Sequence, residues 1–201
     1  MTTNGGPQAA PKLTEAPRIE TERLVLRGWR KDDFRPWFEI LQESAVNRFL
    51  GGTGTTLEDC WRRLAGAVGS WPMLGFGGWA VTSKVDGALI GNVGLFNAWR
   101  DLEPQFAEEP EMGWIFTTAV HGRGFASEAT LAALGWAESN LSPTPIWAII
   151  APENAASLRL AEKLGFRQVS ETLYNGEPTV VLKRPAWTDT PGTSIASPAA
   201  A

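Results

Sequence analysis

The segment AVHGRGFASEAT (residues 119–130) places two glycines around an arginine, between a predicted strand and a predicted helix. Before it, EMGWIFT (111–117) is typical of a strand. After it, SEATLAALGWAESN (127–140) is apolar nearly all round, which predicts a helix buried against a sheet. Small residues at such a turn let several backbone N–H groups face one anion, beside the partial positive charge of the helix N-terminus. The segment therefore predicts either an anion-binding turn or an ordinary tight turn before a helix.

Two familiar phosphate-binding patterns do not fit this segment. A P-loop requires a lysine directly after its second glycine, but Phe125 follows Gly124. The dinucleotide fingerprint requires Gly or Ala three positions after its second glycine, and this chain has Ser127 there. The pattern that remains is His121-x-x-Gly124-x-Ala126.

Charge and composition argue against several classes of partner. The 201 residues carry a formal net charge of -4, and 43% of them are hydrophobic, which predicts one domain with a well-filled core. A nucleic-acid-binding surface is not expected, because such surfaces cluster Lys and Arg. No run of 18 or more apolar residues occurs, and the N-terminus lacks the features of a signal peptide. We therefore expect a soluble, cytoplasmic protein that does not interact with a membrane.

Cys60 is the only cysteine and His121 the only histidine. One cysteine cannot form an internal disulfide, and the pair cannot make a credible zinc site, so no metal is expected. Cys60 falls on the apolar stripe of a predicted helix, where cysteine behaves as a small hydrophobic residue. A Cys/His nucleophilic pair is therefore not expected either.

The chain is predicted to form one domain, residues 18–186, between flexible tails at 1–17 and 187–201 that are rich in Pro, Ala, Ser, Thr and Gly. Asp32 or Asp33 could cap a helix over FRPWFEILQE, and Thr56 a second helix. The apolar stripe predicted for that second helix consists of Cys60, Trp61, Leu64, Val68 and Trp71. WAVTS, DG and ALIGNVGLF predict a β-hairpin. Later segments predict a strand over 146–151, a helix over 154–165 and two closing strands. This order predicts an α/β fold, with a mixed sheet flanked by about four helices.

Four segments resemble the GNAT superfamily of acyl-CoA-dependent N-acyltransferases, and in particular its branch related to ribosomal-protein-alanine N-acetyltransferases. They are IETERLVLRGW (19–29), GALIGNVGL (87–95), EMGWIFTTAVHGRGFASEA (111–129) and PENAASLRLAEKLGF (152–166). They occur in the order found in the family, and the resemblance covers about residues 19–184. It implies the GNAT fold, with a twisted central mixed sheet, and a coenzyme A thioester as the donor.

The resemblance also implies which residues bind acetyl-CoA. The pyrophosphate would lie on the turn formed by His121, Gly122, Arg123, Gly124, Phe125, Ala126 and Ser127. The pantetheine arm would pair with the backbone of the preceding strand, at Trp114, Phe116, Thr117 and Thr118. His121 departs from the Gln, Arg or aromatic residue usual in the family, but the backbone does most of the binding. Arg123 could contact a phosphate or simply point into solvent.

The resemblance gives catalytic candidates as well. Glu111 would be the general base, directly or through water, or else a structural carboxylate at the strand end. Many family members carry a tyrosine acid seven positions after the motif asparagine, but this chain has Ala161 there, and Tyr174 lies outside the motif. Ser157 would instead donate a hydrogen bond to the sulfur. Asn154 would contact the ligand, although Asn154 and Ser157 also suit the first turn of a helix.

The resemblance implies an acetyl-CoA-dependent N-acetyltransferase that acts on a primary amine, either a protein N-terminus or a small molecule, as a monomer or homodimer. Three alternatives stay open: a longer donor such as succinyl-CoA, an acyl-CoA-binding regulatory module without catalysis, and a nucleotide-using enzyme. The acidic loop RDLEPQFAEEPE (100–111) and the aromatic-rich region 49–79 could border the acceptor cleft. They could equally be a solvated loop and core packing.

Overall fold

A mixed eight-stranded sheet organises the computed structural model, which describes residues 13–50, 54–106 and 108–188. The strand order is β1-β2-β3-β4-β5-β6-β8-β7, and every neighbouring pair is antiparallel except β5 and β6, which are parallel. The strands are β1 (Ile19–Glu20), β2 (Leu24–Arg27), β3 (Gly78–Ser83), β4 (Leu89–Phe96), β5 (Glu111–Phe116), β6 (Ile146–Ile150), β7 (Arg167–Tyr174) and β8 (Glu177–Arg184).

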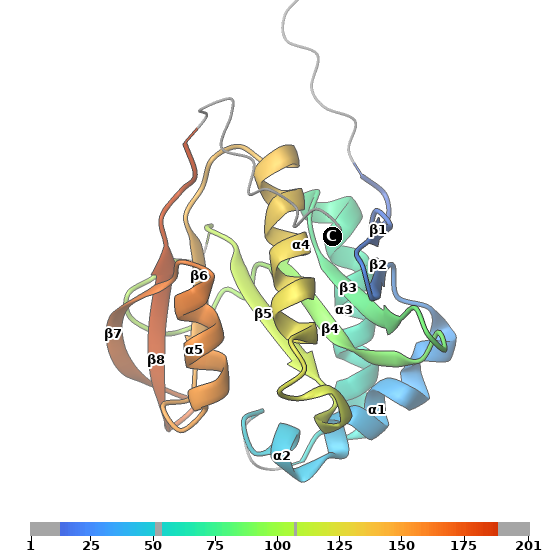
Figure 1. Cartoon of the computed structure of the whole chain (residues 1–201). Helices are drawn as coiled ribbons and strands as arrows, with labels where there is room; N and C mark the ends of the chain where they lie inside the picture. The colour runs from blue at the N-terminus through green and yellow to red at the C-terminus, as the bar shows by residue number, and fades with distance from the viewer. Residues whose placement is uncertain (1–12, 51–53, 107, 189–201) are drawn as a thin grey trace, which may run out of the picture.

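Helices cover both faces of this sheet (Figure 1). The described residues form α1 (Phe34–Gln42), α2 (Ser44–Asn47), α3 (Leu57–Leu74), α4 (Phe125–Asn140) and α5 (Ala155–Lys163), with 3-10 turns η1 (Lys31–Asp33) and η2 (Thr118–Val120). In Figure 1, α4 and α5 lie in front of the sheet, and α1 and α3 lie behind it. The predicted α/β class, a mixed sheet flanked by about four helices, is confirmed, since α2 is a single turn.

The α4 face of the sheet carries the main hydrophobic core. Its fully buried residues include Ala129 and Ala133 of α4, Met112 of β5 and Leu26 of β2. Small residues along α4 let the helix lie close to the strands, which explains why the predicted all-round apolar helix is buried. The core therefore fixes α4, and with it the glycine turn that precedes α4.

The prediction for α3 was correct about its N-cap residue, Thr56, and partly wrong about which residues of its apolar stripe are buried. Thr56 Oγ1 accepts a hydrogen bond from the Asp59 amide over 3.1 Å, and Cys60 is buried. However, Trp61 and Val68 are 45% and 46% exposed. At roughly 100° per residue, Val68 and Trp61 lie about 60° and about 80° around the helix from the mean direction of the buried residues Cys60, Leu64 and Trp71. The buried stripe is therefore narrower than the spacing suggested.

The predicted side-chain cap of α1 is wrong. The α1 N-cap residue, Asp33, makes no side-chain cap hydrogen bond. Its carboxylate instead accepts two 2.7 Å hydrogen bonds from the Arg27 guanidinium and one from the Arg30 amide. A buried carboxylate is stabilised more by an arginine than by an amide alone, so Asp33 ties α1 to the end of β2.

Part of the segment predicted as a tail contacts the core. Leu13 and Ala16 pack against the main hydrophobic cluster, and the Pro17 carbonyl accepts a 2.8 Å hydrogen bond from Trp79 Nε1. Trp187, the first residue of the predicted C-terminal tail, also packs against this cluster. The rest of the predicted tails, residues 1–12 and 189–201 among them, lies outside the described residues.

Candidate active site

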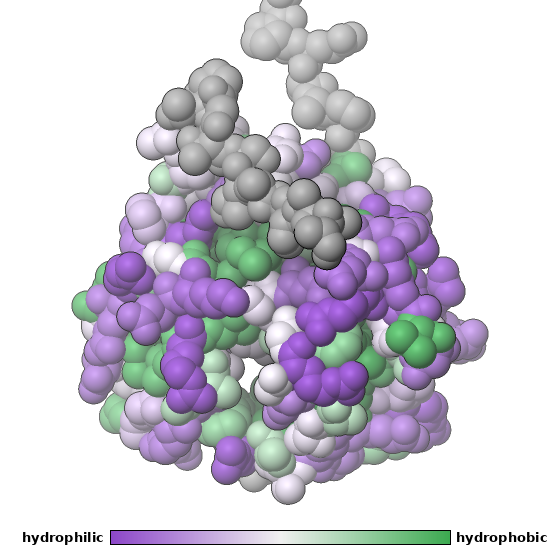
Figure 2. Space-filling view, in the orientation of Figure 1, coloured by the Kyte–Doolittle hydropathy of each residue, from purple (hydrophilic) through white to green (hydrophobic). Residues whose placement is uncertain are grey.

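β5 and β6 are parallel neighbours that separate along their length. Their register is Glu111 opposite Trp147, and the Trp147 amide donates to the Pro110 carbonyl over 2.9 Å. No further β5–β6 register pair occurs among the described residues. Figure 1 shows the two strands diverging toward their C-terminal ends, and Figure 2 shows the surface hollowed there. Ligands of open α/β sheets bind beyond the carboxyl ends of such strands.

The glycine turn lies at the end of β5, at the mouth of this gap. Gly122 and Gly124 have φ angles of +72° and +79°, which favour glycine, and Gly124 is the N-cap residue of α4. The amides of Phe125, Ala126 and Ser127 begin the helix and have no backbone partner in the part of the chain that the structure describes. Residues 121–124 are exposed. Ala126 and Ser127 are half-buried and Phe125 is buried. The segment therefore places unpaired backbone donors directly after an exposed turn, an arrangement that suits an anion.

Glu43, at the junction of α1 and α2, fastens the start of this turn. Its carboxylate accepts hydrogen bonds from Thr117 Oγ1 over 2.5 Å and from the Thr118 amide over 2.7 Å. Burial raises the pKa of the Glu43 carboxyl, but these hydrogen bonds outweigh it and bring that pKa below its usual value. The predicted ligand residue Thr117 thus uses its side chain within the protein. No local pattern pointed to Glu43, because its partners lie more than 70 residues away.

The other predicted residues of the turn divide into exposed and buried groups. The exposed His121 ring contacts the Phe116 carbonyl through Nε2 at 3.0 Å. Arg123 is also exposed, and its Nη1 lies 3.5 Å from the Ala119 carbonyl. The side chains of Phe116 and Phe125 are buried in the main core, so only their backbones are available to a ligand.

Trp114 and Ser157 meet across the gap. Trp114 projects from β5, and its Nε1 donates a 3.2 Å hydrogen bond to Ser157 Oγ on the first turn of α5. Asn154 is the N-cap residue of α5, and its Oδ1 accepts a 3.1 Å hydrogen bond from the Ser157 amide. The capping role that the sequence allowed for Asn154 is therefore present. The structure also brings together three predicted site residues: Trp114 of β5, Ser157 of α5 and the α5 N-cap residue Asn154.

Glu111 lies at the closed end of the gap, where β5 and β6 still pair. Its side chain is 3% exposed, and both carboxylate oxygens accept hydrogen bonds from Arg100, over 2.5 and 2.7 Å. Burial raises the pKa of the Glu111 carboxyl, while Arg100 opposes that rise. The Arg100 guanidinium lies 4.9 Å from the centroid of the Tyr174 ring. Arg100 was not among the predicted site residues, because its spacing from Glu111 fits no regular element.

The acidic loop between β4 and β5 is partly packed. Leu102 and Phe106 are buried with Trp147 and Val181, and the Phe106 ring stacks on the Trp147 ring at 4.7 Å. This loop therefore covers one face of β6 and β8 and holds Arg100 over Glu111. The expectation that the loop is simply solvated is wrong for these two side chains.

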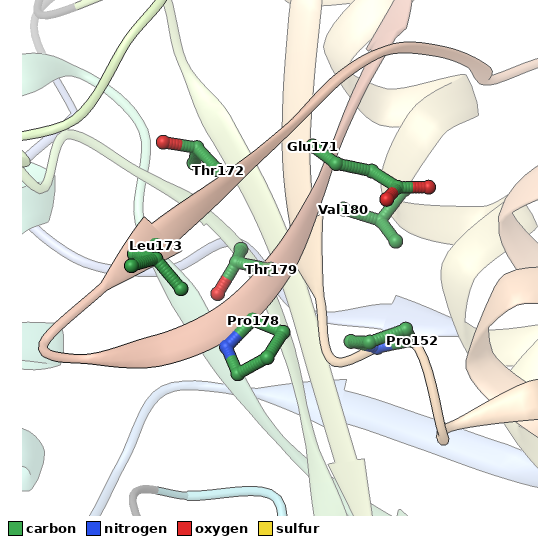
Figure 3. A pocket seen from close by; sticks show the side chains of 7 residues that line it. All are labelled: Pro152, Glu171, Thr172, Leu173, Pro178, Thr179 and Val180. Carbon is green, nitrogen blue, oxygen red and sulfur yellow. The ribbon is translucent and has the colours of Figure 1, made fainter.

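The position of the missing tyrosine is closed to chemistry, because Ala161 is fully buried in the core. Among the described residues, no three His, Cys, Asp or Glu side chains gather in a way that could hold a metal ion. No helix in that part of the chain is both long enough and apolar enough to cross a membrane. A shallow pocket of about 310 Å³ lies between Pro152 and the β7–β8 hairpin (Figure 3) and shares no lining residue with β5 or the glycine turn.

Comparisons with known proteins agree with this architecture. Residues 23–167 match the family model described as the acetyltransferase (GNAT) domain. The chain is 26% identical over 151 residues to the uncharacterized N-acetyltransferase YnaD of Bacillus subtilis, covering 75% of this chain and 82% of that protein. A structure described as a GnaT-family acetyltransferase from Bordetella pertussis superposes with a TM-score of 0.75 at 32% identity, covering 84% of this chain and 99% of the other.

A more distant structure shares the fold. The ribosomal-protein-S5-alanine acetyltransferase of Vibrio fischeri has a TM-score of 0.66 at 20% identity, covering 85% of this chain and 97% of the other. Together, the fold and the family match define an N-acyltransferase. The chain belongs to the GNAT acetyltransferase family.

Proposed function

We propose that this protein transfers an acetyl group from acetyl-CoA to a primary amine by direct attack. The observation that carries the proposal is the pair of parallel strands that separate beside a row of backbone amides without backbone partners among the described residues. Such a gap offers an extended ligand an unpaired strand edge on one side and an anion-binding turn at its mouth. Coenzyme A thioesters have both features: an amide-containing arm and a pyrophosphate.

The turn would hold the donor by its phosphates. The amides of Phe125, Ala126 and Ser127 would bind the pyrophosphate, and the φ angles of Gly122 and Gly124 keep the backbone open to it. The β5 edge beyond Trp114 would pair with the arm. From Phe116 to Glu111 this edge is roughly 17 Å long at about 3.4 Å per residue, so the thioester would lie near the closed end of the gap.

Glu111 would remove a proton from the acceptor. An amine with a pKa of about 10.4 is mostly protonated at neutral pH, and it must be neutral to attack the thioester carbonyl carbon. Attack forms the C–N bond and breaks the C–S bond, and the amine proton passes to Glu111 directly or through water. Burial favours proton uptake by this carboxylate, while Arg100 keeps it ionised beforehand.

Ser157 would stabilise the departing thiolate. An indole N–H can only donate, so the Trp114 hydrogen bond occupies a lone pair of Ser157 Oγ and leaves its hydroxyl hydrogen available. The sulfur would accept that hydrogen bond as negative charge develops on it. This arrangement supplies a donor where Ala161 provides none.

The acceptor would carry one amine beside an apolar group, as a protein N-terminus or a small amine does. Two carboxylates near β5 are already engaged, Glu43 by Thr117 and Glu111 by Arg100, so neither is free to bind a second cationic group of the acceptor. Asn92 pairs with Ile115 across β4 and β5, on the face that packs against α1, and its buried Oδ1 has no hydrogen-bond donor among the residues that the structure describes. A buried acceptor of this kind suits an amine N–H. The acidic net charge fits such a partner better than a nucleic acid.

An amine screen tests the proposal. Wild type would be incubated with peptide N-termini, small primary amines and polyamines, each with acetyl-CoA or succinyl-CoA, and free thiol would be measured. Thiol release with acetyl-CoA and a mono-amine is expected, and Gly124→Val should abolish it together with thermal stabilisation by the donor. Donor binding without release across the panel would favour a binding module instead, and stabilisation by ATP or NAD alone a nucleotide-using enzyme.

A cytoplasmic location and a monomeric or dimeric state belong to the same proposal. The buried free thiol of Cys60 suits a reducing compartment. Sedimentation of the purified chain would measure the oligomeric state.

A further inference from the structure

Arg23 joins the N-terminal segment of the domain to the glycine turn 100 residues later. Its Nη1 donates to the Arg123 carbonyl over 2.9 Å, and its Nε donates to Glu128 Oε2 over 2.6 Å. Its guanidinium carbon lies 4.2 Å from the centroid of the Phe125 ring. A Cβ on Gly124 would lie 3.5 Å from Arg23 Nη2. One side chain therefore contacts the turn, its second glycine and the first turn of α4.

Glu128 is the second half of this connection. Its Oε1 accepts hydrogen bonds from the Arg23 amide over 2.9 Å and from Thr21 Oγ1 over 2.5 Å. Burial raises the pKa of the Glu128 carboxyl, but the bonds from Thr21 and Arg23 outweigh it and bring that pKa below its usual value. The carboxylate is therefore ionised at neutral pH. It lies in the first turn of α4, beside the amides of Phe125, Ala126 and Ser127.

A free carboxylate at this position would oppose the binding of phosphate. The helix N-terminus attracts anions with only a fraction of a unit charge, so a nearby full negative charge would cancel much of its effect. The salt bridge to Arg23 neutralises that charge and also holds the Arg123 carbonyl. Thr21 and Arg23 belong to the segment IETERLVLRGW, and their bonds to Glu128 connect this segment to the glycine turn.

We propose that Arg23 is a positioning residue for the donor: it holds the glycine turn and neutralises Glu128, so that the amides of the turn retain their affinity for the phosphates of coenzyme A. The inference rests on the proposed function, since it takes the turn to be the pyrophosphate site. It adds a residue that acts through the turn without itself being one of the backbone donors.

The test compares two donors that differ in their phosphates. Wild type, Arg23→Gln, Glu128→Gln and the double variant would be assayed with acetyl-CoA and with S-acetyl-N-acetylcysteamine, a thioester without phosphate. Calorimetry would give the Kd of coenzyme A for each. Arg62→Gln is the matched control, because it also removes an arginine that pairs with a glutamate, on the exposed surface of α3.

Arg23→Gln is expected to raise the KM of acetyl-CoA and the Kd of coenzyme A about tenfold, which corresponds to ~1.4 kcal/mol. The kcat/KM with the phosphate-free thioester should stay within twofold of wild type. Adding Glu128→Gln should recover most of the lost affinity, because it removes the exposed charge. Arg62→Gln should leave all of these values unchanged.

Equal losses with both donors would overturn the proposal, since they would show a general effect on the fold. Failure of the double variant to recover would overturn the electrostatic part. If Arg23→Gln does not fold, Glu128→Gln alone decides: the proposal requires its coenzyme A affinity to equal or exceed that of wild type. A wild type that binds coenzyme A but acetylates no amine would overturn the proposed function alone, because the Kd series needs no catalysis.

Discussion

Arg100→Gln separates the catalytic and structural interpretations of Glu111. The substitution removes both hydrogen bonds to a carboxylate that is 3% exposed, and so leaves a buried negative charge without its partner. Removing one partner of a buried ion pair costs about 3–5 kcal/mol, a large part of the ~5–15 kcal/mol that stabilises a typical domain. The free energy of unfolding at neutral pH should fall by roughly that amount.

The deficit should shrink toward acid pH. Burial already raises the pKa of Glu111, and losing Arg100 removes the influence that lowers it, so that pKa rises further. A carboxyl with a raised pKa destabilises the fold when ionised, and the cost disappears as pH falls through the folded pKa toward the unfolded value of about 4.3. Denaturant unfolding of wild type, Arg100→Gln and the double variant with Glu111→Gln at several pH values measures this, and the double variant should recover most of the stability.

The pH dependence of kcat/KM then distinguishes the two roles. If Glu111 is the base, activity falls in acid as its carboxylate is protonated, and Arg100→Gln should move that limb to higher pH. Arg184→Gln is the control, because Arg184 forms a comparable, partly buried pair with Glu138 at 2.5 Å and should lower stability without moving the limb. An unmoved limb in Arg100→Gln, with Glu111→Gln retaining kcat, would refute the catalytic role and leave Glu111 as a structural anchor.

Three further predictions concern the proposed donor site. Ser157→Ala should lower kcat about ten- to hundredfold, as expected for the ~1.5–3 kcal/mol of a hydrogen bond to a charged group. Trp114→Phe should lower kcat less, because it removes only the indole hydrogen bond to Ser157. Thiol release by both single variants and the double variant measures this, and non-additive losses would show that the two residues act together. Gly124→Ala should lower Tm, because a side chain at positive φ costs roughly 1–2 kcal/mol. Gly122→Asn should be tolerated, because asparagine adopts positive φ more readily than alanine. Thermal unfolding measures both. Glu43→Gln should reduce the loss of stability in acid. Because the pKa of Glu43 is lowered in the folded state, its carboxylate stabilises the fold above about pH 4.3, and this stabilisation is lost as pH falls below that value. Denaturant unfolding of wild type and Glu43→Gln between pH 3 and 7 measures the difference.

Local patterns predicted the elements of the fold because each pattern reports a property of one segment. The strand-like segment EMGWIFT marked β5, the glycines marked the turn with two positive φ angles, and Thr56 marked the start of α3. Patterns failed where a neighbouring segment decides the outcome. Trp61 follows the helical spacing but lies at the edge of the buried stripe, and Asp33 bonds to Arg27 rather than capping its own helix.

The partners that hold the candidate site were also beyond local patterns. Glu43 and Thr117 are 74 residues apart, and Arg100 and Glu111 are joined across an irregular loop. Nothing in the spacing of such residues pairs them, since an arginine or a glutamate in a polar segment is ordinarily a solvated side chain. The family resemblance supplied Glu111 and Ser157, but it did not supply Arg100 or the indole hydrogen bond of Trp114.

Glu43, Glu111 and Glu128 hold neighbouring segments in the same way. Each is a carboxylate, and each binds donors from a segment distant in sequence or in a loop: Glu43 holds the end of β5, Glu111 the acidic loop and Glu128 the start of β2. A glycine-rich turn does not fix its own backbone conformation, because glycine can adopt more backbone conformations than other residues. Two of the three carboxylates act at the turn: Glu43 binds the Thr118 amide at its start, and Glu128 pairs with Arg23, which binds the Arg123 carbonyl. Such charged hydrogen bonds provide that order. The proposed donor site therefore depends on the assembled sheet, and we expect the glycine turn alone to bind an anion only weakly.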